Sequence, residues 1–192
     1  FNVTNVHKIF KQIQMDLSGK TVTGFLKTFL RPKPYEQSTI KELKKLVIRE
    51  QFKEEKALVV GGSRGIGEVA SKMLSIGGAD VTITYNRGQG EAKAIVDDLQ
   101  REGFMAKALH LNILNGNLSL PESYTTLYYF ASPFIFSGVK DKFRLESFST
   151  FTDFYIKGLI SLVQLLQPLG LKKVFYPSTM AIDELVNGMW EY

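Results

Sequence analysis

The sequence has no cysteine, two histidines and no long apolar run, and each shortage excludes a class of protein or site. Without cysteine, the chain can form neither a disulfide framework nor a thiolate metal site. His7 and His110 stand apart from other metal-ligating residues, so we expect no metal centre. No stretch supplies the roughly 20 apolar residues that a membrane-spanning helix needs. The sequence therefore predicts a cytoplasmic protein without a membrane segment.

The surplus of positive charge is small and is mixed with acidic residues. The formal net charge is +5, but basic and acidic residues stand together in stretches such as 53–56, Lys-Glu-Glu-Lys. Such mixing is typical of a solvated surface and disfavours a nucleic-acid partner, although it suits a ligand with several phosphates. A length of 192 residues with an ordinary share of hydrophobic residues predicts one medium-sized domain and a short additional segment.

The most informative stretch is 57–67, which reads Ala-Leu-Val-Val-Gly-Gly-Ser-Arg-Gly-Ile-Gly. Four residues that favour a strand run into a glycine cluster, and an amphipathic helix pattern follows at once. A strand that ends in such a turn directs backbone N–H groups and a helix N-terminus at one spot, which suits a phosphate. We expect Gly61 to allow a tight turn, Gly65 to let a pyrophosphate approach, and Gly67 to let the helix pack against the strand.

Alternating strand and helix patterns continue along the chain. The expected order is strand 57–60, helix 66–74, strand 81–85, helix 92–99 and strand 107–111. Further strands are expected at 126–130 and 172–176, on either side of a long apolar helix at 148–169. The stretch 115–121 is too short and too rich in turn residues for another helix. Residues 53–192 are therefore predicted to form an α/β domain of the Rossmann type, a doubly wound parallel sheet with helices on both faces.

The first 52 residues do not continue this pattern, so we expect a separate α+β segment over 1–52. Apolar residues at helical spacing predict a helix over 6–13, and the composition of 21–30 favours a strand. A second helix is expected to begin at Thr39, because Thr39 and Glu42 have the spacing of a capping box. The segment is either a remnant of a preceding domain or a packing arm.

The end of the second strand indicates which dinucleotide is preferred. Folds that prefer NAD place an acidic residue there to hold the ribose 2′-hydroxyl, whereas this strand runs into Asn86 and Arg87. A carboxylate would repel the 2′-phosphate of NADP, and an arginine can pair with it. Arg64, in the glycine turn, can reach the same phosphate. The sequence therefore predicts NADP as the cofactor.

The spacing Gly61-x-x-x-Gly65-x-Gly67 resembles that of short-chain dehydrogenases/reductases, and Gly-Ser-Arg-Gly-Ile-Gly is similar to the reductases acting on 3-oxoacyl thioesters. The resemblance covers about residues 56–192 and implies an oxidoreductase that reduces a carbonyl compound with NADPH. It also implies a set of cofactor contacts on four strand ends. They are Gly61, Ser63, Arg64, Gly65, Ile66, Gly67, Asn86, Arg87, Asn112, Ile113, Ala131 and Ser132. The N-terminal segment more distantly resembles the tail of a hotdog-fold dehydratase.

The same resemblance implies the catalytic groups. These reductases place a serine after the fifth strand and a Tyr-x-x-x-Lys motif shortly beyond it. Ser178 or Thr179 would therefore orient the carbonyl, and Tyr192 would donate the proton. A free phenol has a pKa of about 10 and needs a nearby cation to act near neutral pH. The matching lysine would lie beyond Tyr192, so we expect the sequence to be part of a longer protein.

Departures from the family pattern keep a second interpretation open. The catalytic asparagine of the family would fall near Tyr155, where the sequence has none. The Asn-Asn-Ala-Gly motif after the fourth strand is absent as well, and Ala131-Ser-Pro stands in its place. The alternative is a nucleotide-binding or scaffold protein without catalysis. In either case we expect a homo-oligomer, because the helix at 148–169 is apolar over more surface than one sheet covers.

Overall fold

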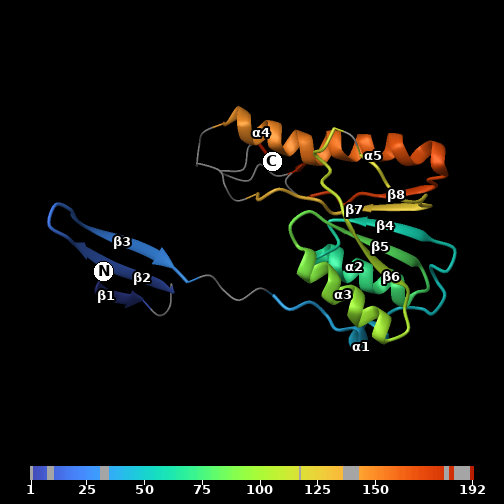
Figure 1. The fold of residues 1–192 in the computed structure, drawn as a ribbon, viewed down its shortest axis with the longest axis horizontal. Helices are drawn as coiled ribbons and strands as arrows, with labels where there is room; N and C mark the ends of the chain where they lie inside the picture. Colours follow the sequence, from blue (N-terminus) through green and yellow to red (C-terminus); the bar gives the residue numbers. More distant parts are fainter. Residues whose placement is uncertain are drawn as a thin grey trace. The chain divides into compact units, whose positions relative to one another are not determined.

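The computed structural model divides the chain into two compact units, Phe1–Glu36 and Gln37–Tyr192 (Figure 1). The boundary lies at residue 36 rather than at the expected residue 52. The residues that the structure describes are 2–7, 11–30, 35–116, 118–135, 143–179, 182–183 and 191–192. None of the helices in these ranges is both long and apolar enough to cross a membrane.

The first unit is an antiparallel sheet of three strands, β1 (Asn2–His7), β2 (Gln12–Ser18) and β3 (Thr23–Phe29). The strand expected over 21–30 is confirmed, but the helix expected over 6–13 is wrong. Val6 pairs with Ile13 across the β1–β2 hairpin, so these two apolar residues meet between strands rather than along one helix. Short apolar segments fit both periodicities, and cross-strand pairing decided the outcome here.

Residues 37–52 belong to the second unit. Helix α1 (Ile40–Leu43) begins after Thr39, as expected, and the capping box is present. The Thr39 N–H donates to the Glu42 carboxylate at 2.8 Å, and the Glu42 N–H donates to Thr39 Oγ1 at 3.3 Å. Ile40 and Leu43 are buried in the same hydrophobic cluster as the first strand of the large sheet. This burial is why the unit begins before residue 53.

The second unit is a Rossmann-type fold built on a five-stranded parallel sheet (Figure 1). The strand order is β6-β5-β4-β7-β8. The strands are β4 (Lys56–Val60), β5 (Asp80–Tyr85), β6 (Ala106–His110), β7 (Thr126–Tyr129) and β8 (Lys173–Phe175). Every strand pair is parallel, and the reversal of order between β4 and β7 marks the switch point at which such folds bind ligands. The α/β prediction is confirmed.

Helices cover both faces of this sheet, as expected. Helices α2 (Gly65–Ile76) and α3 (Gln89–Arg101) lie on one face, and one long helical segment lies on the other (Figure 1). The long segment consists of α4 (Leu145–Thr152), the π-helical turn η1 (Asp153–Lys157), α5 (Gly158–Leu166) and the short 3-10 helix η2 (Gln167–Leu169). It replaces the uninterrupted helix expected over 148–169.

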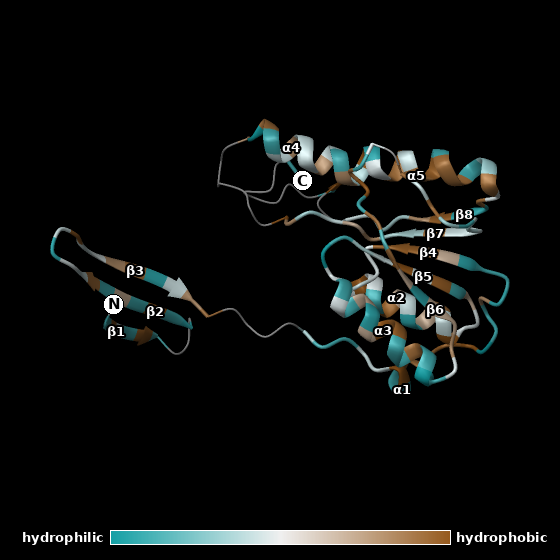
Figure 2. Ribbon diagram, viewed as in Figure 1, coloured by the Kyte–Doolittle hydropathy of each residue, from teal (hydrophilic) through white to brown (hydrophobic). Residues whose placement is uncertain are grey.

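Strand β4 is the centre of the core, because it is buried on both faces. Successive residues of a strand point to opposite sides, so Val59 packs toward α2 and α3 while Leu58 packs toward α5. Leu162 and Leu166 of α5 are fully buried against the second face. Each such side chain contributes about 1.5–3 kcal/mol through burial. In Figure 2, hydrophobic colour covers the later part of β4 and alternates with polar colour along α5.

The connection between β6 and β7 contains no helix among its described residues, as expected from its length. Its partly buried Leu118 and Leu120 pack on the cluster beneath α5, and Tyr124 is fully buried there. Glu122 anchors the connection through ion pairs with Lys56 and Lys107, each at 2.5 Å. Burial raises the pKa of Glu122, but the hydrogen bonds and charges of the two lysines outweigh it and lower the pKa to about 2.

We expect Glu122→Gln to lower the free energy of unfolding by about 0.5–1 kcal/mol near neutral pH, since the ion pairs are partly exposed and screened. Because the folded-state pKa is lowered from 4.5 to about 2, the stabilisation is present above pH 4.5 and is lost as the pH falls toward 2. Urea unfolding of both proteins across this range measures the difference. Glu54→Gln, at an exposed position, is the control. A difference that does not shrink in acid would contradict this assignment.

Candidate functional site

The glycine turn follows β4 and lies next to the loops that follow β5 and β7. A Cβ on Gly61 would lie 2.9 Å from the backbone nitrogen of Ala131, and one on Gly67 would lie 2.4 Å from the carbonyl oxygen of Gly61. The turn is therefore packed against both the β7 loop and the first turn of α2, as expected for these two glycines. Thr84 of β5 also holds the turn, because its hydroxyl accepts from the Gly61 N–H at 3.3 Å. Sequence reasoning missed Thr84.

Gly65 differs from the other two glycines because the space around it is open. Its φ is +59°, and a Cβ there would meet nothing within 4 Å. Helix α2 begins at this residue, and the N-cap residue Arg64 makes no side-chain capping bond to its first turn. The first N–H groups of a helix have no partners within that helix, so the open space at this helix start is suited to the pyrophosphate of a dinucleotide.

Two arginines lie beside the glycine turn. Arg64 reaches the loop after β5, where a Cβ on Gly88 would be 3.0 Å from its guanidinium. Arg87 immediately precedes Gly88 and is exposed, as is Asn86. Arg64 also faces Glu91 of α3 at 3.9 Å, in an exposed ion pair that sequence reasoning did not find. The structure thus places the Arg64 guanidinium at the loop that carries Arg87 and adds an acidic neighbour.

Asn112 and Ile113, two of the expected cofactor contacts, take part in local structure. Asn112 accepts from the Leu114 N–H at 3.1 Å and donates to the side chain of Asn115 at 3.1 Å, which closes an Asx turn. The side chain of Ile113 is buried in the hydrophobic core. Any contact that Ile113 makes with a cofactor would therefore come from its backbone. Of the remaining cofactor candidates, Ser63 is buried and Ile66 is exposed.

Hydroxyl groups gather at the other end of the site. Ser132, in the exposed loop after β7, lies 2.6 Å from the hydroxyl of Tyr155. The ring of Tyr155 meets that of Tyr192 edge to face, with the centroids 5.6 Å apart. Phe151 stacks on Tyr155 at 6.0 Å and also touches Tyr192. Thus the structure joins the predicted cofactor residue Ser132 to the predicted proton donor Tyr192 through Tyr155.

Ser178 and Thr179 follow β8 at the same edge of the sheet. Ser178 is exposed and Thr179 is half-buried. Burial raises the pKa of Tyr176, which lies two residues before Ser178. The electrostatic interaction with Tyr192 raises this pKa further. The end of β8 therefore lies near Tyr192. A choice between the two hydroxyls stays a prediction.

The π-helical turn η1 explains how Tyr155 comes to face Ser132. The Gly158 N–H donates to the carbonyl of Asp153, five residues earlier, instead of the carbonyl of Phe154. The freed Phe154 carbonyl accepts from the hydroxyl of Tyr129 in β7. A Cβ on Gly158 would lie 2.7 Å from that hydroxyl, so only glycine leaves room for it. Turns of this kind occur often at functional sites.

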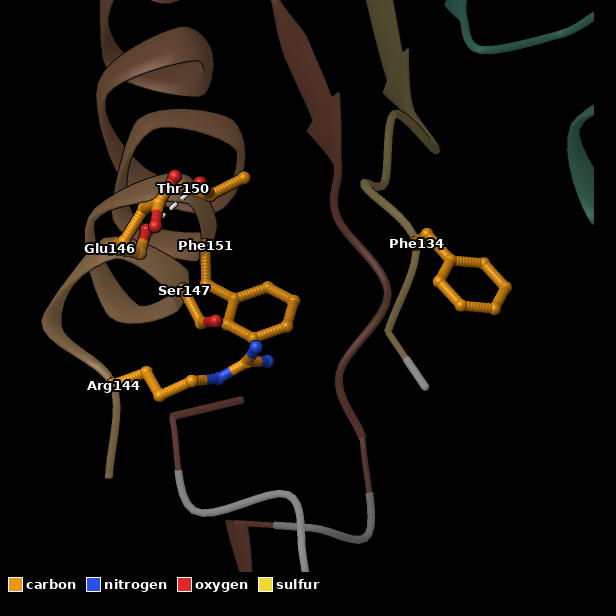
Figure 3. Close-up of a pocket in the computed structure, with 6 residues that line it drawn as sticks. All are labelled: Phe134, Arg144, Glu146, Ser147, Thr150 and Phe151. Atoms are coloured by element: carbon orange, nitrogen blue, oxygen red, sulfur yellow. Dashed lines mark hydrogen bonds between the residues drawn. The ribbon is translucent and has the colours of Figure 1, made fainter. Parts of the chain in front are cut away.

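A cavity of about 260 Å3 lies next to Phe151, whose ring also contacts Tyr155 and Tyr192 (Figure 3). Phe134 of the β7 loop and Phe151 of α4 border it, and the Arg144 side chain extends toward Phe151. The other lining residues are Glu146, Ser147 and Thr150. The backbone N–H of Arg144 donates to the buried carboxylate of Glu191 at 2.7 Å, which holds the neighbouring Tyr192 at this place. Within the described part of the chain, no group of acidic and histidine residues could hold a metal ion.

We expect Gly158→Ala to lower the free energy of unfolding by about 1–3 kcal/mol, because the new methyl group collides with the Tyr129 hydroxyl and disturbs η1. Gly90→Ala is the matched control. Gly90 also lies in a helix, but a Cβ there meets nothing within 4 Å, so alanine should be neutral or stabilising. Thermal unfolding of both variants measures the effect. Equal stability of the two variants would show that η1 does not need the glycine.

Comparison with known proteins agrees with the fold. No family model matches the chain. It is 42% identical over 57 residues to the short-chain dehydrogenase/reductase homolog YusS of Bacillus subtilis, covering 30% of this chain and 52% of that protein. It is 33% identical over 61 residues to the 3-oxoacyl-[acyl-carrier-protein] reductase FabG of Staphylococcus epidermidis, covering 32% and 25% respectively. The matched part thus spans about half of the first relative and a quarter of the second.

Among solved structures, a short chain dehydrogenase from Burkholderia cenocepacia in complex with NADP is 26% identical, with a TM-score of 0.61. The match covers 74% of this chain and 62% of that one. The comparisons give no support to the dehydratase-like resemblance of the N-terminal segment, and the similarity to the FabG reductase is partial. Together, the fold, the glycine turn and these similarities support the short-chain dehydrogenase/reductase family for the Rossmann unit of this chain.

Proposed function

We propose that the chain forms the cofactor-binding part of an oxidoreductase that reduces a ketone with NADPH. The observation that carries the proposal is the open space over Gly65 at an uncapped helix start, with Arg64 beside it. The NADP complex of the Burkholderia protein supports the choice of cofactor. NADPH, when bound, supplies the hydride.

The chain's own residues would hold the cofactor and manage the proton. The N–H groups of the glycine turn and the start of α2 bind the pyrophosphate, and Arg64 and Arg87 pair with the 2′-phosphate. Tyr192 donates its phenolic proton to the carbonyl oxygen as negative charge develops there. Ser178 or Thr179 donates a hydrogen bond that orients the same oxygen.

The substrate that we propose is a 3-oxoacyl thioester or a ketone of similar shape. The partial similarity to the FabG reductase supports this class. The acyl chain would lie along Phe134 and Phe151, the two apolar residues that border the cavity. Its two charged members, Arg144 and Glu146, lie at the start of α4.

One observation favours the alternative, a nucleotide-binding or scaffold protein without catalysis. Asn112 uses its amide group to close a local turn, so an adenine contact through its oxygen would compete with the Leu114 N–H. Ketone reduction by the purified protein separates the two functions, since only the first turns NADPH over.

We expect NADPH to bind at least about tenfold tighter than NADH, because charge-assisted hydrogen bonds to the 2′-phosphate have no counterpart in NADH. Arg87→Asp should abolish or reverse this preference. Glu91→Gln should strengthen NADPH binding slightly, since it removes the carboxylate that faces Arg64. Titration calorimetry with both cofactors measures all three proteins. Equal or tighter binding of NADH by the parent protein would refute the choice of NADP.

Tyr192→Phe removes the phenolic hydroxyl and should lower the rate of ketone reduction at least about 100-fold, because the proton is needed as charge develops on the substrate oxygen. NADPH binding should stay nearly unchanged. Ser178→Ala and Thr179→Val should separate the two orienting candidates, with one large loss and one small loss, and we favour Ser178 because the β-branched Thr179 side chain is less free. Tyr192→Phe with the parental rate would show that the proton donor is another group.

We also propose a homo-oligomer that uses the outer face of the long helical segment. Leu145, Phe148, Ile156 and Ile160 lie between 46% and 70% exposed along α4, η1 and α5. Light scattering should show a dimer or a larger assembly at micromolar concentration. Ile160→Lys should shift it toward the monomer without weakening NADPH binding, whereas Met105→Lys, at a more exposed site outside the long helical segment, should not. A parent protein that is monomeric at this concentration would refute the proposal.

A further inference from the structure

The three-stranded sheet of the first unit has two faces of different character. Paired residues of neighbouring antiparallel strands point to the same side of the sheet. Met15 of β2 pairs with Val3 of β1 and with Leu26 of β3, so three apolar side chains form a row across the sheet with Met15 at its centre. The register places six apolar residues on this side, which we call the apolar face: Val3, Val6, Ile13, Met15, Leu17 and Leu26.

A β-bulge keeps the apolar face continuous. The register of β1 against β2 shifts between Val3 and Asn5, so Thr4 is an extra residue on β1. Residues three apart in a regular strand point to opposite sides, but the bulge brings Val3 and Val6 to the same side. The Thr4 hydroxyl, by contrast, lies 3.3 Å from the carboxylate of Asp16 on the other side. The bulge thus gathers apolar side chains on one face, which a surface left in water would not need.

No second layer covers the apolar face among the described residues of its own unit, which form only the three strands. Val3, Val6 and Leu26 are 62%, 52% and 46% exposed, and the apolar residues of β2 are partly exposed. A sheet with one hydrophobic face must bury that face against another element or another molecule. The apolar face therefore needs a partner.

The distribution of charge indicates what kind of partner fits. Phe1–Glu36 contains six lysine and arginine residues and two acidic residues, so its formal net charge is +4. The apolar face has no charged residue, whereas Asp16 and Lys27 lie on the opposite face, where Lys27 is 5.6 Å from the ring of Phe25. A nucleic acid or an anionic membrane would need basic residues on the face that it meets. An identical apolar face needs none, and stacking two of them keeps both sets of like charges on the outside.

We propose that the apolar face packs against the same face of a second copy of this chain. Two sheets stacked in this way form a sandwich with its layers about 10 Å apart, and Met15 lies near the two-fold axis. The contact would remove roughly 1,000 Å2 of surface from water, which is about what a specific interface needs. This inference depends neither on the proposed reductase function nor on the interface proposed for the long helical segment.

The sequence has no native cysteine, so one introduced thiol reports on the apolar face in the full chain. Met15→Cys puts this thiol at the centre of the face, and cysteine is apolar enough to preserve the packing. Its reaction with DTNB should slow at least about fivefold as the protein concentration rises from micromolar to hundreds of micromolar, because dimers bury the thiol. Gln14→Cys is the matched control. Gln14 precedes Met15 on β2 and points to the opposite face, so its thiol should react at one rate throughout.

The same measurement in an Ile160→Lys background separates this contact from the interface proposed for the second unit. Protection of the Met15→Cys thiol should persist there, because Ile160 belongs to α5. Light scattering in this background should show a dimer for the otherwise unchanged chain and a monomer for Met15→Lys, which would bury an unpaired charge. Gln14→Lys should remain a dimer, since its charge is added to the opposite face.

Three results would overturn the proposal. A Met15→Cys thiol that reacts at one rate at every concentration, as fast as the control, would show that the face is free. Equally strong protection at every concentration would show that the same chain covers it. Protection that appears only when anionic vesicles are added would assign the face to a membrane instead.

Discussion

The burial of β4 on both faces is the constraint on which the rest of the second unit depends. Val59 and Leu58 point into separate clusters, so helices must cover both sides of the sheet before either face is shielded from water. After β4, the chain leaves the core at the carboxyl end of the strand, through the turn at Gly61. Because neighbouring strands are parallel, their loops come to the same edge. The site is a consequence of this arrangement.

The second face shows how one displaced hydrogen bond shapes the site. The described residues between β6 and β7 form no helix, so the long helical segment and this irregular connection cover the face together. Gly158 lies against β7, where Tyr129 takes the carbonyl that a regular helix would have used for Gly158. Burial raises the pKa of Tyr129, which keeps its hydroxyl protonated as a donor. Packing of the helix on the sheet therefore determines which way Tyr155 faces.

Much of the fold follows from local patterns. Strand β4 and helices α2 and α3 were predictable because β4 is an unbroken apolar run and the two helices have one apolar face each, whereas the π-helical turn that interrupts the helix expected over 148–169 was not. The capping box at Thr39 was predictable because its bonds join residues three apart. The hairpin in residues 2–18 was not, since Val6 and Ile13 suit a helix as well as a strand pair and only cross-strand contact decides.

For the site, the sequence by itself determined the glycine turn and the charge beside it, because those features depend on backbone freedom and residue type within a few positions. Tertiary structure alone decided the rest. Thr84, Glu91 and Tyr155 reach the site from other elements, and no spacing in the sequence links them to it. The side chain of Ile113 is buried in the core because α5 packs against the sheet there, which no local pattern in the sequence indicates. Contacts between residues far apart in the chain exist only after the hydrophobic faces have packed.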